Sequence, residues 1–248
     1  MSLSWRRKHL RIGLAPERVM VSGAKVIDVP AGAGGWDAAL QCLGEPLAAA
    51  KGGEASVVIA DQLARYALLP WNDTLKTEEQ WLALARHRFA GLHGARATEW
   101  DVRVTATAPK GPRLGCAVDL ALIEGLKAAC AAHEIRLVSV QPFLVAAYNR
   151  IRRMVGSRSC WVVVEEHGRI TLVLIKDGAW LAIRGRRCDE RWRLVLPEIL
   201  EREAAFLGLS EPCTRVIVCA QDGFDTQMHG EWRTDALSYR ELALAAPE

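Results

Sequence analysis

The 248-residue chain has no long hydrophobic run, no cysteine pattern and little excess charge. No stretch approaches the roughly 18 to 20 apolar residues that cross a bilayer, and the amino terminus lacks the apolar core of a signal peptide. We therefore expect the protein in the cytoplasm. The formal net charge of +3 gives no reason to expect nucleic acid as a partner, although basic residues cluster locally.

The seven cysteines indicate neither a disulfide framework nor a metal site. Their number is odd, and most of them lie inside apolar segments, as buried reduced thiols do. No Cys-x-x-Cys pair and no Cys/His cluster has the spacing of zinc ligands. We therefore expect no structural metal.

What the chain does contain is one pattern in both of its halves: three short apolar strands joined by tight turns, followed by a helix. Such a duplication indicates an α/β fold of two lobes with a cleft between them. The first copy is predicted at 10–14, 19–22 and 25–29 with a helix over 36–51, and the second at 160–164, 170–175 and 180–184 with a helix over 193–207.

An inserted subdomain is predicted between the two copies. The segment from about 61 to 118 has the pattern strand, helix, strand, strand, and Thr77 to Gln80 forms a capping box at the start of the helix. Beyond the second copy, 215–219 is predicted as a strand and 221–234 as irregular. We therefore expect mixed sheets flanked by helices in a first lobe over 1–155, which carries the subdomain, and a shorter second lobe over 156–248.

The first hairpin turn of each half carries residues that disfavour phosphate. In nucleotide-binding proteins of this architecture, these turns hold phosphate through free backbone N–H groups and glycine. Pro16 has no N–H, and carboxylates repel phosphate oxygens. The turns therefore indicate a degenerate nucleotide site, and the residues concerned are Ala15, Pro16, Glu17, Glu165 and Glu166.

The sequence predicts no catalytic residue. Glu165 and Glu166 with His167 could be imagined as an acid–base pair or, beside Asp61, as magnesium ligands. Adjacent strand residues point to opposite faces, so we interpret these glutamates as a solvated hairpin tip. The glycine run 32–35 lacks the lysine and hydroxyl of a phosphate loop, and no serine has a nucleophile-elbow pattern.

Four stretches of the chain resemble one family in their order and spacing. They are the first hairpin over 11–19, the strand 57–60 with 67–70, the block 119–142 and the second hairpin over 162–175. In these stretches the sequence resembles the actin-like assembly proteins that include PilM of type IV pili and the cytoplasmic domain of GspL of type II secretion. The resemblance implies a duplicated actin-like, ribonuclease H-like fold over nearly the whole chain.

Departures from the nucleotide-binding members of that fold imply that ATP is not bound. Those relatives carry Asp and Gly in the first turn, where this chain has Gly13 and Ala15, and Asp-x-Gly where it has 163–165 as Val-Val-Glu. They also carry paired glycines after the late strand, where 219–222 reads Cys-Ala-Gln-Asp. Backbone donors, magnesium carboxylates and room for the base are lost together, so we expect no cofactor.

The resemblance also implies a partner. Pilus members recruit the cytoplasmic tail of an inner-membrane protein at the inserted subdomain, and secretion members dock the assembly ATPase. We expect a short peptide at the sheet edge of the subdomain or in the groove beside it. By resemblance the contact residues are Tyr66, Trp71, Trp81, Phe89 and Trp100, for which packing inside the subdomain is the open alternative.

Two functions from different classes remain. One is a non-catalytic scaffold of a pilus or secretion platform with a degenerate nucleotide cleft, at the inner face of the inner membrane, where arginines 6, 7, 150, 152 and 153 could face anionic lipid. The other is an actin-fold ATPase or small-molecule kinase with an atypical phosphate loop. Whether the scaffold forms a homodimer stays open.

Overall fold

The computed structural model describes residues 9–23, 26–30, 35–50, 52–166, 168–211 and 213–220, and the backbone alone for 233–238. Several features of the sequence therefore lie outside the described residues: Arg6, Arg7, His167, Gly32 and Gly34 of the glycine run, most of the segment predicted as irregular, and the carboxyl-terminal tail. Within the described ranges, no helix is both long and apolar enough to cross a membrane.

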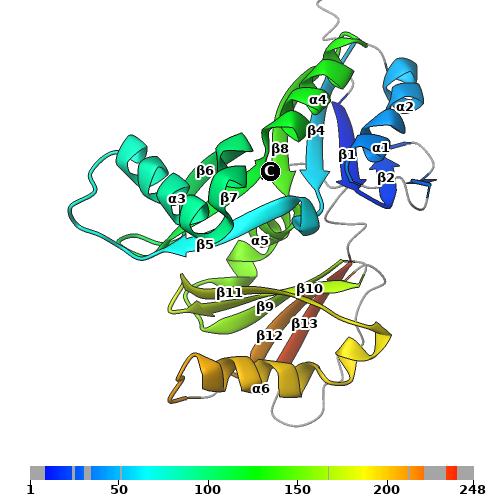
Figure 1. The fold of residues 1–248 in the computed structure, drawn as a ribbon. Coiled ribbons are helices and arrows are strands. Elements are labelled where there is room, and N and C mark those ends of the chain that lie inside the picture. Colours follow the sequence, from blue (N-terminus) through cyan, green and yellow to red (C-terminus); the bar gives the residue numbers. More distant parts are fainter. Residues whose placement is uncertain are drawn as a thin grey trace, which may run out of the picture.

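Two five-stranded sheets share one topology, with strand orders β3-β2-β1-β4-β8 and β11-β10-β9-β12-β13. In each sheet three consecutive strands form an antiparallel meander, and two later strands add in parallel beside the first strand of that meander. This repetition confirms the predicted duplicated α/β fold (Figure 1). The strands are β1 (His9–Ala15), β2 (Arg18–Val21), β3 (Ile27–Asp28), β4 (Glu54–Ile59), β8 (Arg136–Pro142), β9 (Cys160–Glu166), β10 (Arg169–Lys176), β11 (Ala179–Arg187), β12 (Arg215–Ala220) and β13 (Arg233–Ser238).

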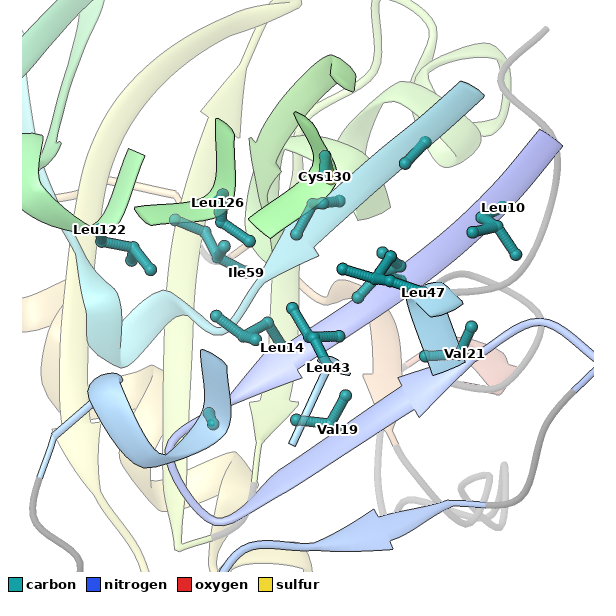
Figure 2. Close-up of a cluster of buried hydrophobic side chains, with 14 of the residues drawn as sticks. Leu10, Leu14, Val19, Val21, Leu43, Leu47, Ile59, Leu122, Leu126 and Cys130 are labelled. Carbon is teal, nitrogen blue, oxygen red and sulfur yellow. The ribbon is translucent and has the colours of Figure 1, made fainter. Parts of the chain in front are cut away.

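Helices α1 (Asp37–Gln41), α2 (Gly44–Ala49) and α4 (Leu120–Ala131) cover one face of the first sheet. Strand β4 alternates strictly between buried and half-buried residues, which places one side-chain row against these helices. Figure 2 shows the resulting core, in which side chains from the strands meet those of α2 and α4. The single helix predicted over 36–51 is wrong: the helix breaks at Cys42 and Leu43, and Pro46 lies in the first turn of α2, where no N–H is needed.

Helix α5 (Phe143–Val155) packs between the two sheets (Figure 1). Its fully buried side chains Ala147, Ile151 and Val155 lie in the same core cluster as Val162 of β9 and Val173 of β10. The opposite face of the second sheet is covered by α6 (Leu196–Phe206), which follows the short 3-10 helix η3 (Glu190–Arg193). Because α5 contributes to the core between the sheets, the two lobes share buried apolar surface.

The inserted subdomain is a three-stranded antiparallel sheet in the order β5-β7-β6, with one long helix on one face. The predicted capping box is confirmed: the Thr77 hydroxyl accepts from the Gln80 N–H at 3.3 Å, and the Gln80 side chain accepts from the Thr77 N–H at 3.1 Å. The elements are η1 (Asp61–Leu63), β5 (Ala64–Leu69), α3 (Glu78–His93), η2 (Gly94–Glu99), β6 (Trp100–Ala106) and β7 (Arg113–Asp119).

The carboxyl-terminal part of the second lobe differs from the prediction in two places. Helix α6 begins at Leu196 instead of Arg193, because the residues before it form η3 with Asp189 as its side-chain cap. Strand β13 lies parallel to β12 and begins at Arg233, inside the segment predicted to be irregular up to Thr234. The second sheet therefore has its fifth strand, as the first sheet does.

Candidate functional site

The first hairpin turn is a two-residue turn, with Ala15 opposite Arg18 in the register of β1 and β2. Pro16 and Glu17 form its tip. The Glu17 carboxylate accepts a hydrogen bond of 2.9 Å from the Gln62 side-chain amide, which lies just after β4. The tip is therefore short, contains a proline without an N–H, and holds a carboxylate toward the neighbouring strand end.

The second hairpin places Glu166 in a buried position, which corrects the predicted solvated tip. Strand β9 continues through Glu166, whose side chain is only 8% exposed, whereas Glu165 is half-buried. Glu166 Oε2 accepts a 2.7 Å hydrogen bond from the Asp61 backbone N–H, 105 residues away. The prediction failed because the partner of Glu166 belongs to the other lobe, and no local pattern marks that contact.

Glu17, Asp61 and Glu166 thus form a carboxylate junction between the lobes. Asp61 follows β4 and is 8% exposed, and its Oδ1 accepts from the Tyr66 hydroxyl at 2.5 Å and from the Leu144 N–H at 2.9 Å. Leu144 lies in the first turn of α5, whose own N-cap residue makes no side-chain cap. Asp61 therefore acts as the cap of α5 from a distant part of the chain.

Burial dominates the ionisation of this junction. It raises the pKa of Asp61 to about 6, against the lowering effects of the hydrogen bonds from Tyr66 and Leu144 and of the Arg169 charge. Burial also raises the pKa of Glu166 well above its ordinary value, and the nearby charges of Asp61 and Glu17 add to that rise. The hydroxyl of Tyr66, buried beside Asp61, likewise has a raised pKa.

The junction concentrates carboxyl groups between the two lobes. The site where both hairpins meet presents carboxyl groups, and anions are disfavoured beside them. Nor does it offer a ready magnesium site, because no group of three or more metal-ligating His, Cys, Asp or Glu residues occurs in the described part of the chain. Glu165 and Glu166 cannot act as a pair, since they occupy opposite faces of β9, as strand alternation predicts.

The aromatic residues expected at a partner contact have different positions in the structure. Trp81 and Phe89 are 1% and 0% exposed in the core between α3 and the subdomain sheet, so their side chains offer no surface to a partner. Tyr66 faces the carboxylate junction instead. Trp71 and Trp100 are half-buried and pack on that core: the Trp71 ring is tilted against Trp81 at a centroid distance of 5.8 Å, and the Trp100 ring meets Phe89 edge-on at 6.1 Å.

A pocket of about 340 Å³ lies on the other face of the subdomain sheet, which α3 does not cover. We call it the β6 groove, because β6 supplies a continuous run of its lining. Strand β6 is an edge strand of its sheet, since the order is β5-β7-β6. The lining residues are Ile59, Asp101, Arg103, Val104, Thr105, Ala106, Thr107, Leu114, Cys116, Val118, Ile123, Val140, Gln141, Pro142, Val145, Tyr148, Asn149 and Trp180.

The groove exists because the second lobe and α5 cover only part of the sheet face. Leu68 and Leu114 pack in the same core cluster as α5 and Trp180, and the remaining face toward β6 stays open. The floor is apolar, and an ion pair between Arg103 Nε and Asp101, 3.1 Å long, lies on the β6 side. The sequence predicts a groove beside the subdomain edge but not the walls from α5 and β11, which are distant in the chain.

Comparison with known proteins supports the fold and leaves function open. No family model and no curated protein matches the sequence. Among solved structures, the chain is similar to a Bacteroides thetaiotaomicron protein with an actin-like ATPase fold and unknown function, at 13% identity and a TM-score of 0.60, covering 87% of this chain and 83% of that one.

Two further solved structures belong to assembly machines. One is a chain of the PilM–PilN type IV pilus biogenesis complex, at 13% identity and a TM-score of 0.59, covering 86% of this chain and 81% of that one. The other is the cytoplasmic domain of EpsL, an inner-membrane component of the type II secretion system of Vibrio cholerae, at 12% identity and a TM-score of 0.58, covering 95% and 92%. The duplicated sheets and these likenesses together establish that the chain has the actin-like ATPase fold.

Proposed function

We propose that this chain is a non-catalytic scaffold of a type IV pilus or type II secretion assembly platform, and that it binds an apolar segment from an inner-membrane assembly protein in the β6 groove. The likeness in fold to a chain of the PilM–PilN complex and to the EpsL cytoplasmic domain supports the class of machine. The observation that carries the proposal is an apolar groove alongside β6, an edge strand that has no further strand beside it among the described residues.

The geometry of the groove suits an extended peptide. An edge strand has unpaired backbone N–H and C=O groups, to which a peptide can add as a further strand while its side chains enter an adjoining pocket. Here the edge strand is β6 and the adjoining pocket has walls from Val140, Val145 and Tyr148. The ion pair of Asp101 and Arg103 at the rim offers polar partners for residues that flank the apolar segment.

Trp180 contributes apolar surface to the groove wall. Its ring packs edge-on against Tyr148 with centroids 4.9 Å apart. Burial of an apolar peptide side chain against these two rings would add to binding.

Nucleotide chemistry is disfavoured by the carboxylate junction, so the scaffold is proposed to act without ATP hydrolysis. The junction places Glu17, Asp61 and Glu166 where the two hairpins meet. An ATPase or kinase would need backbone N–H donors and a bound magnesium ion there to hold phosphate. A scaffold of this kind would also bind the assembly ATPase, which is the second partner that we propose.

The proposal is tested by binding experiments with purified protein and the cytoplasmic tails of inner-membrane assembly proteins from the same genome, alongside the assembly ATPase. Thr105→Arg adds a long cation in the groove, where Thr105 is exposed and lines the pocket. Ala83→Arg makes a comparable change on exposed α3, on the opposite side of the same sheet. We expect one tail to bind, with a loss of about tenfold or more, near 1.4 kcal/mol, for the groove variant alone.

Two results would refute the proposal. Failure of every tail and of the assembly ATPase to bind the wild-type chain would remove the scaffold role. If a tail binds the Thr105→Arg and Ala83→Arg variants with equal affinity, the tail does not bind in the groove.

A further inference from the structure

Asp61 and Glu166 form a buried contact between the two lobes of the molecule. Asp61 follows β4 of the first sheet, and Glu166 ends β9 of the second sheet. The Asp61 N–H donates to Glu166 Oε2 at 2.7 Å, and each residue is 8% exposed. The two carboxyl groups are therefore neighbours in a place that bulk water reaches poorly.

Among the described residues, each of these carboxyl groups has hydrogen-bond partners at one oxygen and none at the other. Asp61 Oδ1 accepts from Tyr66 and from Leu144, and Glu166 Oε2 accepts from the Asp61 backbone. Asp61 Oδ2 and Glu166 Oε1 are buried without a partner among the described residues. Two ionised carboxylates whose free oxygens have no partner would be costly in this buried place. If one of the two groups is protonated, its O–H can donate to the free oxygen of the other group, and both oxygens then have a partner.

The charged and titratable groups around the pair favour holding that proton. Glu17 in the β1–β2 turn adds a third carboxylate, while Arg169 at the start of β10 is the cation that acts on both Asp61 and Glu166. Tyr66 of β5 and Cys116 of β7 are neutral neighbours, because burial raises the pKa of both, that of Cys116 to about 12. The amino-terminal end of α5 stabilises negative charge on Asp61, which assigns the proton preferentially to Glu166.

We propose that Asp61 and Glu166 share one proton in a hydrogen bond between Oδ2 and Oε1, and that this proton is a pH-sensitive latch between the lobes. With the proton in place, both carboxyl groups are fully hydrogen-bonded and the lobe contact carries a single negative charge. Loss of the proton leaves two like charges side by side in a buried position, which opposes the contact. The lobe junction is therefore weaker at alkaline pH.

A proton fits this pair better than a metal ion does. Magnesium and calcium take six or more oxygen ligands, and the pair offers two free oxygens. The Asp61 N–H already occupies the other oxygen of Glu166. Glu17 does not complete a metal site with the pair, because no group of three or more His, Cys, Asp or Glu residues in the described part of the chain is placed to hold a metal ion.

Amide substitutions test the latch because they replace the proton by a permanent donor. In Asp61→Asn, the amide oxygen keeps the bonds from Tyr66 and Leu144, and the NH₂ group can donate to Glu166. In Glu166→Gln, the amide oxygen keeps the bond from the Asp61 backbone, and the NH₂ group can donate to Asp61. In the double variant, the NH₂ groups introduced at positions 61 and 166 are both donors, and neither finds an acceptor on the other side chain.

Urea unfolding over a pH series gives the first result. We expect the wild-type midpoint to fall as pH rises from the ordinary glutamate pKa of 4.5 upward, each single variant to have a flatter profile, and the double variant to be less stable than the sum of the singles predicts. Glu165→Gln, on the opposite face of β9, is the matched control and should keep the wild-type profile. Single variants with the wild-type profile, or a double variant with additive stability, would overturn the proposal.

Infrared spectroscopy gives a second result that does not depend on how the variants fold. The wild-type protein at neutral pH should show the carbonyl stretch of a protonated carboxyl group, and this band should vanish on titration to alkaline pH. If the wild-type protein shows no such band at neutral pH, the shared proton does not exist. If magnesium raises the urea midpoint and the infrared spectrum shows no band of a protonated carboxyl group, the site binds a cation instead of a proton. That result would equally overturn the proposal.

Discussion

At the scale of single residues, Asp61 connects three parts of the molecule. Its side chain accepts hydrogen bonds from Tyr66 in the subdomain and from Leu144 at the start of α5, and its backbone N–H donates to Glu166 in the second lobe. Such a residue is expected to affect stability more than its single charge suggests, because its removal leaves buried groups without partners. An acidic residue directly after a buried parallel strand is the sequence signal that could have marked it.

The Tyr66 hydroxyl offers a direct measure of this network. Tyr66→Phe removes a donor to Asp61, and we expect a loss of about 1–3 kcal/mol in the free energy of unfolding. The bond lowers the pKa of Asp61, so it favours the charged carboxylate, and the loss should be larger above pH 6 than below it. Urea unfolding of both proteins at acidic and alkaline pH measures the difference.

Tyr148→Phe is the matched control for that experiment. The Tyr148 hydroxyl makes no hydrogen bond within the described residues, and its ring packs on Trp180. If both variants lose the same free energy of unfolding, or if the loss in Tyr66→Phe does not change with pH, the Tyr66–Asp61 hydrogen bond does not stabilise the ionised carboxylate.

The two buried carboxyl groups also predict how the wild-type protein responds to pH. Both have a higher pKa in the folded than in the unfolded chain. Between those two values the folded chain binds more protons, so the free energy of unfolding falls as pH rises. For Asp61 the loss runs from the ordinary aspartate pKa of 3.8 up to about 6, and for Glu166 it continues upward from the ordinary glutamate value of 4.5.

That pH profile is measured by thermal unfolding in buffers of constant ionic strength. A stability that rises over the same window would contradict the raised pKa values. The Asp61→Asn variant, which cannot titrate at this position, should lose the contribution of Asp61 to the decline, which ends near pH 6, and keep that of Glu166.

At the scale of secondary-structure elements, α3 depends on a cap that is local in sequence. Thr77→Ala removes the side-chain acceptor for the Gln80 N–H, and we expect a loss of about 1 kcal/mol in the free energy of unfolding. Thr77→Ser keeps the hydroxyl and should retain most of that stability. Urea unfolding distinguishes the two, and an equal loss in both variants would show that the cap is not the cause.

Elements built from local signals were predictable, and elements built from distant contacts were not. The capping box at Thr77 and the short apolar strand at 57–60, which is β4 in the structure, are readable because capping and runs of apolar residues are local signals of a few residues. The break in the helix predicted over 36–51 was missed, since Pro46 suits the start of a second helix as well as an interruption of one. Strand β13 was missed because its partner β12 alone decides its pairing.

The candidate site divides in the same way. The proline and acid of the first turn and the groove beside the subdomain edge follow from the sequence and its resemblance. The burial of Glu166 against Asp61 does not, because the two residues are 105 positions apart. The burial of Trp81 and Phe89 is likewise decided by how α3 packs, since a tryptophan is equally at home in a small core and at an interface.

At the scale of the whole molecule, α5 couples the two lobes. Ile151 is fully buried in the core between the sheets, and Ile151→Ala should lower the free energy of unfolding by about 2–5 kcal/mol. Met154, 38% exposed on the same helix, gives a control whose change to Ala should cost less than about 0.5 kcal/mol.

Hydrogen exchange shows whether that loss reaches both lobes. Because α5 packs against β4 and β8 as well as β9, we expect Ile151→Ala to reduce protection in both five-stranded sheets. Reduced protection in the second sheet alone would show that the lobes unfold independently and that α5 belongs to one of them.

The proposed scaffold function requires that the carboxylate junction of Glu17, Asp61 and Glu166 excludes nucleotide. Calorimetric titration of the wild-type protein with Mg-ATP tests it most directly. We predict no saturable heat up to millimolar nucleotide. Saturable binding with a micromolar dissociation constant would contradict the claim.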